Sequence, residues 1–282
     1  MSSFEHHHHG HHGRSDAEDQ NRDYVEANRA HSDSSNLVEL LDEHPVFVEF
    51  ADTYVLFLSN TFLQAGKPFL YSVGKAMREI FPFDPKNTIV LDFACGTGLS
   101  ARSYAPYVKS VLGVDISQKS LDIYNKQALA KGFADKMTCV CIELKGNEGE
   151  LDGVKFDVVT CVMAYHHFAS AKDTTVMLAK LLKPGGMLLI VDIEAPSAHD
   201  PHAEPAAVID GMQGLNHVAN KHGYTTEDIQ EIFEGAGLVS FDMKHLAHIE
   251  LKDSSFGADT FMAKGFDVDT FMAQGVKPME GC

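Results

Sequence analysis

The chain has 282 residues, of which 44% are hydrophobic and 22% charged, enough for one large or two small globular domains. Its 40 acidic residues outnumber its 23 lysines and arginines, and the formal net charge of −17 argues against nucleic acid as the main partner. No apolar run approaches the roughly 18–20 residues of a membrane span, and no signal peptide is evident. The five cysteines form no CxxC pair, so we expect a cytoplasmic protein with reduced thiols.

The N-terminal part divides into a polar tail and a helical segment. Residues 1–22 include a histidine tract at 6–12, which is either a tag or a native low-complexity tail, and we expect a disordered arm there. From 23 to 82 apolar residues recur at helical spacing, which predicts an N-terminal helical cap.

Strands and helices alternate over residues 83–265, which predicts an α/β domain with a doubly wound, mostly parallel sheet. The expected strands are Thr88–Phe93, Ser110–Asp115, Met137–Ile142, Phe156–Val162, Met187–Asp192, Val239–Leu251 and Thr260–Ala263. The expected helices are Leu99–Tyr107, Gln118–Gly132 with Ser117 as N-cap, Ala171–Leu182, and one that Thr226 caps and that ends near Glu234. An irregular insertion spans 194–223. No helix separates the last two strands, so one of them should be antiparallel.

The C-terminal part contains a short tandem repeat. Residues 259–265 read DTFMAKG and residues 269–275 read DTFMAQG. Only one copy can form the final strand. We expect the first copy to do so, with a tail at 266–282 that extends an edge or hangs free.

A glycine turn follows the first expected strand, Asp92-Phe93-Ala94-Cys95-Gly96-Thr97-Gly98. Glycines there allow a tight turn and let a ligand approach the backbone. The next strand ends at Asp115, where a carboxylate suits the two hydroxyls of a ribose. The turn matches the dinucleotide pattern GxGxxG only if Ala101 replaces the third glycine. Asp92 would repel a pyrophosphate but attract the ammonium and sulfonium groups of S-adenosylmethionine, so charge favours that cofactor over NAD.

Three later motifs occur in order after the turn: VDIS at 114–117, FDVV at 156–159 and LKPGG at 182–186. With them, residues 87–264 resemble class I S-adenosylmethionine-dependent methyltransferases of the type found in ubiquinone and menaquinone biosynthesis. The resemblance implies a Rossmann-like, seven-stranded sheet with an antiparallel terminal hairpin, and S-adenosylmethionine as cofactor.

The resemblance also implies cofactor-binding residues. It places the methionine part of the cofactor at Asp92, Ala94, Gly96 and Gly98, the ribose at Asp115, and one face of the adenine at Ile116. Many relatives have glycine in place of Ala94, and we expect alanine to be tolerated if its φ is negative. Further candidates are Glu143 for the adenine amino group, Val162, Cys95 as a small filler beside the cofactor, and Tyr24 as a lid tyrosine or a surface helix residue.

The acceptor side is expected after the fourth strand, at Tyr165-His166-His167-Phe168. Histidine is well suited to remove a proton near neutral pH, so His166 or His167 is the candidate base, and Tyr165 is a candidate positioning hydroxyl. One histidine could instead cap the next helix. Asp192 could position a substrate donor or serve the structure.

Two further regions could shape the acceptor site. The insertion holds His199, His202, His217 and His222 without HxH or HExxH spacing, so we expect no metal. Apolar residues in the cap could floor a pocket or form ordinary core, namely Val46, Phe50, Tyr54 and Phe57.

These observations favour an enzyme that transfers a methyl group to an O, N, S or C atom of a small organic molecule by a histidine-assisted in-line displacement. The alternatives are a non-catalytic regulatory protein that binds S-adenosylmethionine and, less favoured, an NAD-dependent oxidoreductase.

Overall fold

The computed structural model describes residues 12–34, 69–195, 218–251, 266–279 and 281. Four features of the sequence lie outside the described residues. They are residues 6–11 of the histidine tract, the apolar residues Val46, Phe50, Tyr54 and Phe57, the insertion histidines His199, His202 and His217, and the first copy of the repeat.

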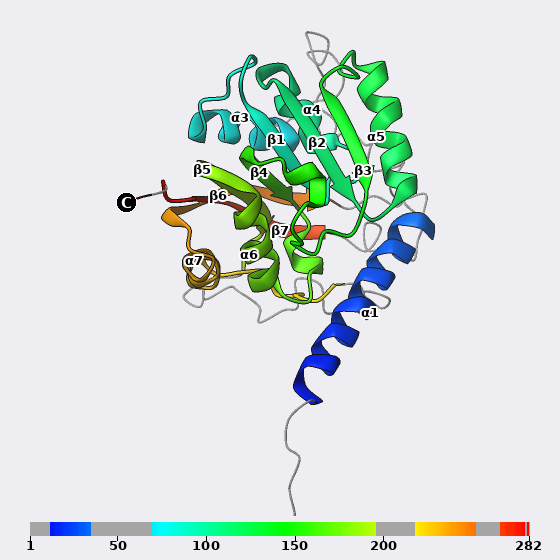
Figure 1. The fold of residues 1–282 in the computed structure, drawn as a ribbon, viewed down its shortest axis with the longest axis vertical. Coiled ribbons are helices and arrows are strands. Elements are labelled where there is room, and N and C mark those ends of the chain that lie inside the picture. Colours follow the sequence, from blue (N-terminus) through cyan, green and yellow to red (C-terminus); the bar gives the residue numbers. More distant parts are fainter. Residues whose placement is uncertain (1–11, 35–68, 196–217, 252–265, 280, 282) are drawn as a thin grey trace, which may run out of the picture.

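The sheet has seven strands in the order β3-β2-β1-β4-β5-β7-β6 (Figure 1). Every pair from β3 to β5 is parallel, and β7 runs antiparallel to both of its neighbours. The strands are β1 (Ile89–Phe93), β2 (Ser110–Asp115), β3 (Met137–Cys141), β4 (Phe156–Val162), β5 (Leu182–Ile193), β6 (Val239–Leu251) and β7 (Phe266–Val276). This topology confirms the predicted Rossmann-like α/β fold.

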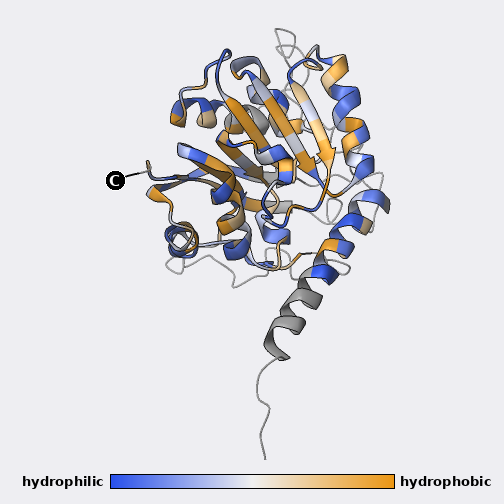
Figure 2. Cartoon of the chain, viewed as in Figure 1, coloured by the Kyte–Doolittle hydropathy of each residue, from blue (hydrophilic) through white to orange (hydrophobic). Residues whose placement is uncertain are grey.

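Helices cover both faces of the sheet. The helices on the faces are α3 (Phe69–Ile80), α4 (Leu99–Tyr104), α5 (Gln118–Ala130), α6 (Ala171–Leu181) and α7 (Thr226–Gly235). The structure also has α1 (His12–Ser34) and 3-10 turns η1 (Ala105–Tyr107), η2 (Glu150–Gly153) and η3 (Tyr165–His167). One core contains side chains of α3, α4 and α5, and the other contains side chains of α6 and α7. Figure 2 shows hydrophobic strands between these helices.

Hydroxyl side chains cap α5 and α7, the two helices for which the sequence suggests a cap, with one shift of position. The Ser117 hydroxyl accepts a hydrogen bond from the backbone of Ser120 and caps α5 as predicted. The predicted cap of α7 is wrong by one residue. Thr225 has an extended backbone and exchanges bonds with Asp228 in a capping box, which leaves Thr226 as the first helical residue.

The final strand is made by the second copy of the repeat, so the expectation that the first copy forms it is wrong. Residues 266–276 lie between β5 and β6 in the interior of the sheet. The amide oxygen of Gln274 is buried there without a hydrogen-bond partner. The equivalent residue of the first copy is Lys264, whose charged amine would be costly to bury at this place.

Helix α1 lies against the carboxyl edge of the parallel strands. Arg29 donates to the carbonyl of Ile116 at 3.2 Å, and the Ser117 hydroxyl donates to Asp33 at 2.6 Å, so α1 contacts the loop after β2. Asn28 donates to the carbonyl of His167 at 3.3 Å, in the turn after β4. Among the described helices, none is both long and apolar enough to span a membrane.

Candidate active site

The turn after β1 has an unusual backbone. Ala94, Gly96 and Gly98 all have positive φ values, of 55°, 51° and 72°. The condition under which we expect alanine to be tolerated, a negative φ at Ala94, is therefore not met, because the turn places a residue with a Cβ in the left-handed region, which favours glycine.

The two glycines of the turn serve different needs. A Cβ added to Gly96 would meet no heavy atom within 4 Å, so the backbone there faces open space. A Cβ on Gly98 would lie 2.4 Å from the ring of Tyr124 on α5. Gly98 thus permits close packing, while Gly96 leaves room in which a ligand can contact the backbone.

Asp115 joins this turn to the end of β2. One carboxylate oxygen accepts from the amide of Gly96 at 2.8 Å, and the other accepts from the amide of Ser117 at 2.9 Å. Burial raises the pKa of Asp115, and these amide bonds oppose the rise. Each oxygen keeps a lone pair for another donor.

Asp92 lies beneath the turn in the protein interior. It is 1% exposed, and its oxygens lie 3.0 Å from the Thr160 hydroxyl and 3.4 Å from the Ser100 hydroxyl. Burial raises its pKa to about 7. Both carboxylate oxygens have partners inside the protein, so this geometry favours an effect on a bound cation through the electrostatic field rather than by contact.

The remaining cofactor candidates occupy the same edge with varied exposure. Cys95 is buried, and burial raises the pKa of its thiol, as suits a filler rather than a nucleophile. Glu143 forms an ion pair with Lys145 at 3.7 Å. Val162 ends β4 half-buried, and Tyr24 is half-buried on α1.

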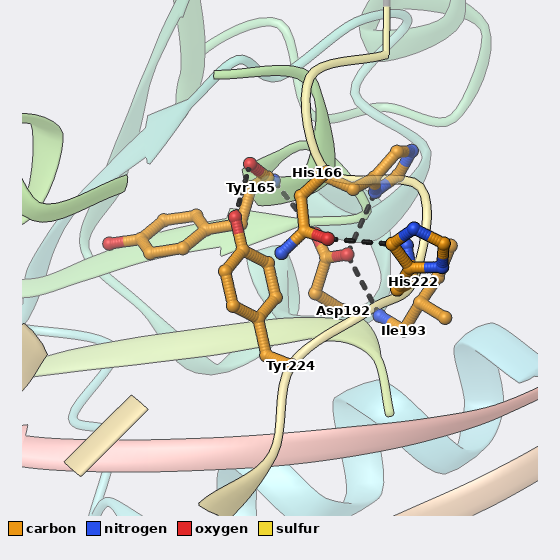
Figure 3. A network of polar contacts seen from close by, with 7 residues as sticks. Tyr165, His166, Asp192, Ile193, His222 and Tyr224 are labelled. Carbon is orange, nitrogen blue, oxygen red and sulfur yellow. Dashed lines mark hydrogen bonds and ion pairs between the residues drawn. The ribbon is translucent and has the colours of Figure 1, made fainter. Parts of the chain in front are cut away.

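The turn after β4 brings a histidine to a buried carboxylate (Figure 3). The ring nitrogen Nδ1 of His166 lies 2.7 Å from Oδ1 of Asp192, which is fully buried near the end of β5. Asp192 is held in turn by two backbone amides, those of Tyr165 to Oδ2 at 2.7 Å and Ile193 to Oδ1 at 2.8 Å. The adjacent ring of His167 lies against His166, with centroids 4.1 Å apart.

Tyr165 points away from this edge. Its side chain is fully buried, and its hydroxyl pairs with Thr175 of α6 at 3.0 Å. The geometry does not favour the predicted contact between this hydroxyl and a substrate, because the apolar core of α6 and α7 surrounds it.

The methyltransferase domain family matches residues 68–240, which are more than half of the chain. The chain belongs to this family.

Two curated relatives share part of this methyltransferase domain. An uncharacterized methyltransferase of Schizosaccharomyces pombe is 33% identical over 178 residues, which cover 61% of each chain. A ubiquinone biosynthesis O-methyltransferase of Idiomarina loihiensis is 35% identical over 99 residues, covering 35% of this chain and 40% of the relative. The chain thus spans less than two thirds of the length of these relatives.

Solved structures share the fold of the methyltransferase domain at low identity. The YcgJ protein of Bacillus subtilis matches with a TM-score of 0.56 and 20% identity, over 74% of this chain and 98% of that one. Magnesium protoporphyrin IX methyltransferase from Synechocystis, solved with bound SAH, matches with a TM-score of 0.57 and 17% identity, over 90% of this chain and 99% of that one.

The candidate site includes one residue that the sequence did not single out. Tyr224, just after the insertion, donates from its hydroxyl to the carbonyl of Tyr165 at 3.0 Å. No motif marks this tyrosine, and only the fold brings it to the turn. His222, the one insertion histidine that is described, is exposed and donates from its backbone amide to Asn220. Among the described residues, no group of three or more His, Cys, Asp or Glu side chains could hold a metal ion.

Proposed function

We propose that this protein transfers a methyl group from S-adenosylmethionine to a small organic molecule, with His166 as the general base. The observation that carries the proposal is the contact of 2.7 Å between His166 and the buried Asp192, at the sheet edge that also bears the glycine turn. In an open α/β sheet, ligands bind at this carboxyl edge of the parallel strands.

The residues at the edge fit the cofactor. The open backbone at Gly96 can receive its methionine part, and the free lone pairs of Asp115 can accept from both ribose hydroxyls. Ile116, Glu143 and Val162 are the candidates for the adenine side. When bound, the cofactor supplies an electrophilic methyl group on a sulfonium.

Asp192 determines which nitrogen of His166 can act. The carboxylate accepts a hydrogen from Nδ1, which leaves the lone pair on Nε2 to take a proton from the methyl acceptor. Two backbone amides fix the carboxylate, so the ring orientation is also fixed. This arrangement supports His166 rather than His167 as the base. It favours acceptors that must lose a proton, such as a hydroxyl, in agreement with the O-methyltransferase among the relatives.

Two measurements test the proposal. S-adenosylhomocysteine should raise the melting temperature of the protein, whereas NAD should not, and the opposite pattern would support the oxidoreductase alternative. The protein is then incubated with labelled S-adenosylmethionine and a metabolite extract. We expect a labelled small molecule with the wild type and at least a hundredfold less with His166→Gln. Binding without any labelled product would favour the non-catalytic alternative, and equal labelling by both proteins would exclude His166 as the base.

A further inference from the structure

Three consecutive backbone carbonyls of the turn that carries His166 accept hydrogen bonds from distant segments. The carbonyl of Tyr165 accepts from the hydroxyl of Tyr224 at 3.0 Å, and that of His166 accepts from the amide of Asn220 at 2.9 Å. The carbonyl of His167 accepts from the side chain of Asn28 at 3.3 Å. Segments 139 and 59 residues away in sequence thus meet at one short turn.

The turn has little internal support of its own. It is a single three-residue 3-10 turn, and its local backbone bonds run from His167 to Ala164 and from Phe168 to Tyr165. Met163, which leads into it, has a φ of 54°, a strained value for a residue with a long side chain. Such a turn keeps its geometry only when its surroundings hold it.

Tyr224 holds the turn from the side of the insertion (Figure 3). Its backbone is anchored to β5, because its amide donates to Ile193 at 3.0 Å and its carbonyl accepts from Ala195 at 2.9 Å. The side chain is 5% exposed. Burial beside Asp192 raises the pKa of the phenol, so the hydroxyl stays neutral and remains a donor.

Asn28 holds the turn from the other side. It lies on α1, which also contacts the loop after β2 through Arg29 and Asp33. That loop includes Ile116, a candidate for the adenine. One helix therefore connects the expected cofactor loop to the turn that carries the base.

We propose that Asn28 and Tyr224 are positioning residues that align His166 from two sides. The base is then aligned only when the carbonyl of His167 receives its hydrogen bond from Asn28 and the carbonyl of Tyr165 receives its hydrogen bond from Tyr224. This inference rests on the proposed function. It makes the alignment of His166 depend on Asn28 of α1, on the cofactor side, and on Tyr224 of the segment 218–224, on the acceptor side.

The test measures the imidazole tautomer by nitrogen NMR of histidine-labelled protein at pH 8 with S-adenosylhomocysteine. The His166 signal is identified by its loss in His166→Gln. We expect the wild type to carry its hydrogen almost entirely on Nδ1. In Tyr224→Phe and in Asn28→Leu, we expect the share of the other tautomer to rise at least threefold and labelling of the extract to fall at least tenfold.

Two matched controls separate positioning from general damage. Thr175→Val removes the hydroxyl that pairs with Tyr165 but leaves the carbonyls of the turn untouched. Arg29→Met weakens the docking of α1 at Ile116 without touching the turn. Both controls should keep the wild-type tautomer, even where they lower the melting temperature as much as the two test variants do, or more. Asn28 is half-buried on a surface helix, so its variant tests the inference even if Tyr224→Phe does not fold.

The outcomes distinguish this inference from the proposed function. If Tyr224→Phe and Asn28→Leu keep both the wild-type tautomer and the wild-type labelling, the positioning role is overturned and the proposed function stands. If the controls shift the tautomer as much as the two test variants do, the effect is general and the inference also fails. If the wild type does not bind S-adenosylhomocysteine, or His166→Gln labels the extract fully, the proposed function itself fails.

Discussion

Asp92 and Thr160 lie directly opposite each other on β1 and β4, and the threonine hydroxyl donates to the carboxylate at 3.0 Å. The other oxygen faces the Ser100 hydroxyl of α4. The remaining titratable groups around the carboxylate are Tyr104 on α4, Tyr124 on α5, Cys95 and Cys161, and Asp115, which adds a negative charge. Since burial dominates, the pKa rises to about 7.

This buried acid should make the protein less stable as the pH rises. Between about pH 4 and pH 7 the folded state keeps a proton that the unfolded state has lost, because the pKa rises from 3.8 to about 7 on folding. Stability from this group therefore falls across that window, by up to roughly 4 kcal/mol, and is level above it. Urea unfolding of Asp92→Asn and wild type at pH 5 and pH 8 isolates the effect. The variant should gain stability relative to the wild type at pH 8, and a difference that does not change with pH would contradict the prediction.

Alanine at the two glycines of the turn should have different effects. Gly96→Ala should still fold, with a loss of about 1–2 kcal/mol of stability for its positive φ. It should bind S-adenosylhomocysteine at least tenfold more weakly, because the new Cβ would occupy the open space in which we expect the ligand to contact the backbone. Gly98→Ala should lose more stability, since its Cβ would lie 2.4 Å from the ring of Tyr124. Calorimetric titration and urea unfolding measure the two effects. Unchanged binding by Gly96→Ala would remove Gly96 from the site.

Glycine should be better accepted than alanine at position 94. The left-handed φ of 55° strains Ala94 by about 1–2 kcal/mol, which Ala94→Gly relieves, while the added freedom of the unfolded chain offsets roughly 0.4–1 kcal/mol. We expect stability that is unchanged or up to about 1.5 kcal/mol higher. Ala101→Gly is the control, because Ala101 is fully buried in α4 and should lose about 1 kcal/mol or more. Equal losses in both variants would show that position 94 is not strained.

The amide variant of Asp192 should lose both activity and stability. Both of its oxygens accept from backbone amides, so the NH2 group of Asp192→Asn must face the amide of Tyr165 or of Ile193. We expect a loss of about 1–3 kcal/mol of stability. Labelling of the extract should fall by roughly 10² to 10⁴, because the tautomer of His166 is no longer fixed. His166→Gln should lose similar activity with a smaller loss of stability. An active Asp192→Asn would show that the carboxylate does not orient the base.

The sequence predicted the strands and helices well where each residue type matches its local environment. Strands β2, β4 and β6 have the predicted bounds. In β4, a mostly apolar run from Phe156 to Val162 is largely buried by the sheet, which is the pattern that predicts such a strand. The same pattern cannot show which copy of the repeat forms the final strand, since both copies have nearly the same sequence. The choice between them depends on the interior position of Gln274, which appears only once β5 and β6 are in place.

The sequence predicts which segments form the candidate site, but it does not predict which side chains of these segments face one another. His166 and Asp192 follow or end neighbouring parallel strands, so the sequence predicts that they share an edge. Which histidine faces Asp192 depends on the rotation of the turn, and the left-handed backbone at Met163 contributes to it. The inward direction of Tyr165 and the arrival of Tyr224 depend likewise on tertiary packing, which a local motif does not encode.

The place of β7 between β5 and β6 has a consequence for synthesis on the ribosome. Until residues 266–276 have left the exit tunnel, β5 lacks its neighbour on that side, and β6 has no strand to join it to the sheet. The nascent chain therefore exposes an apolar, unpaired edge for as long as this last strand is missing. A translation pause after residue 251 would prolong that vulnerable interval.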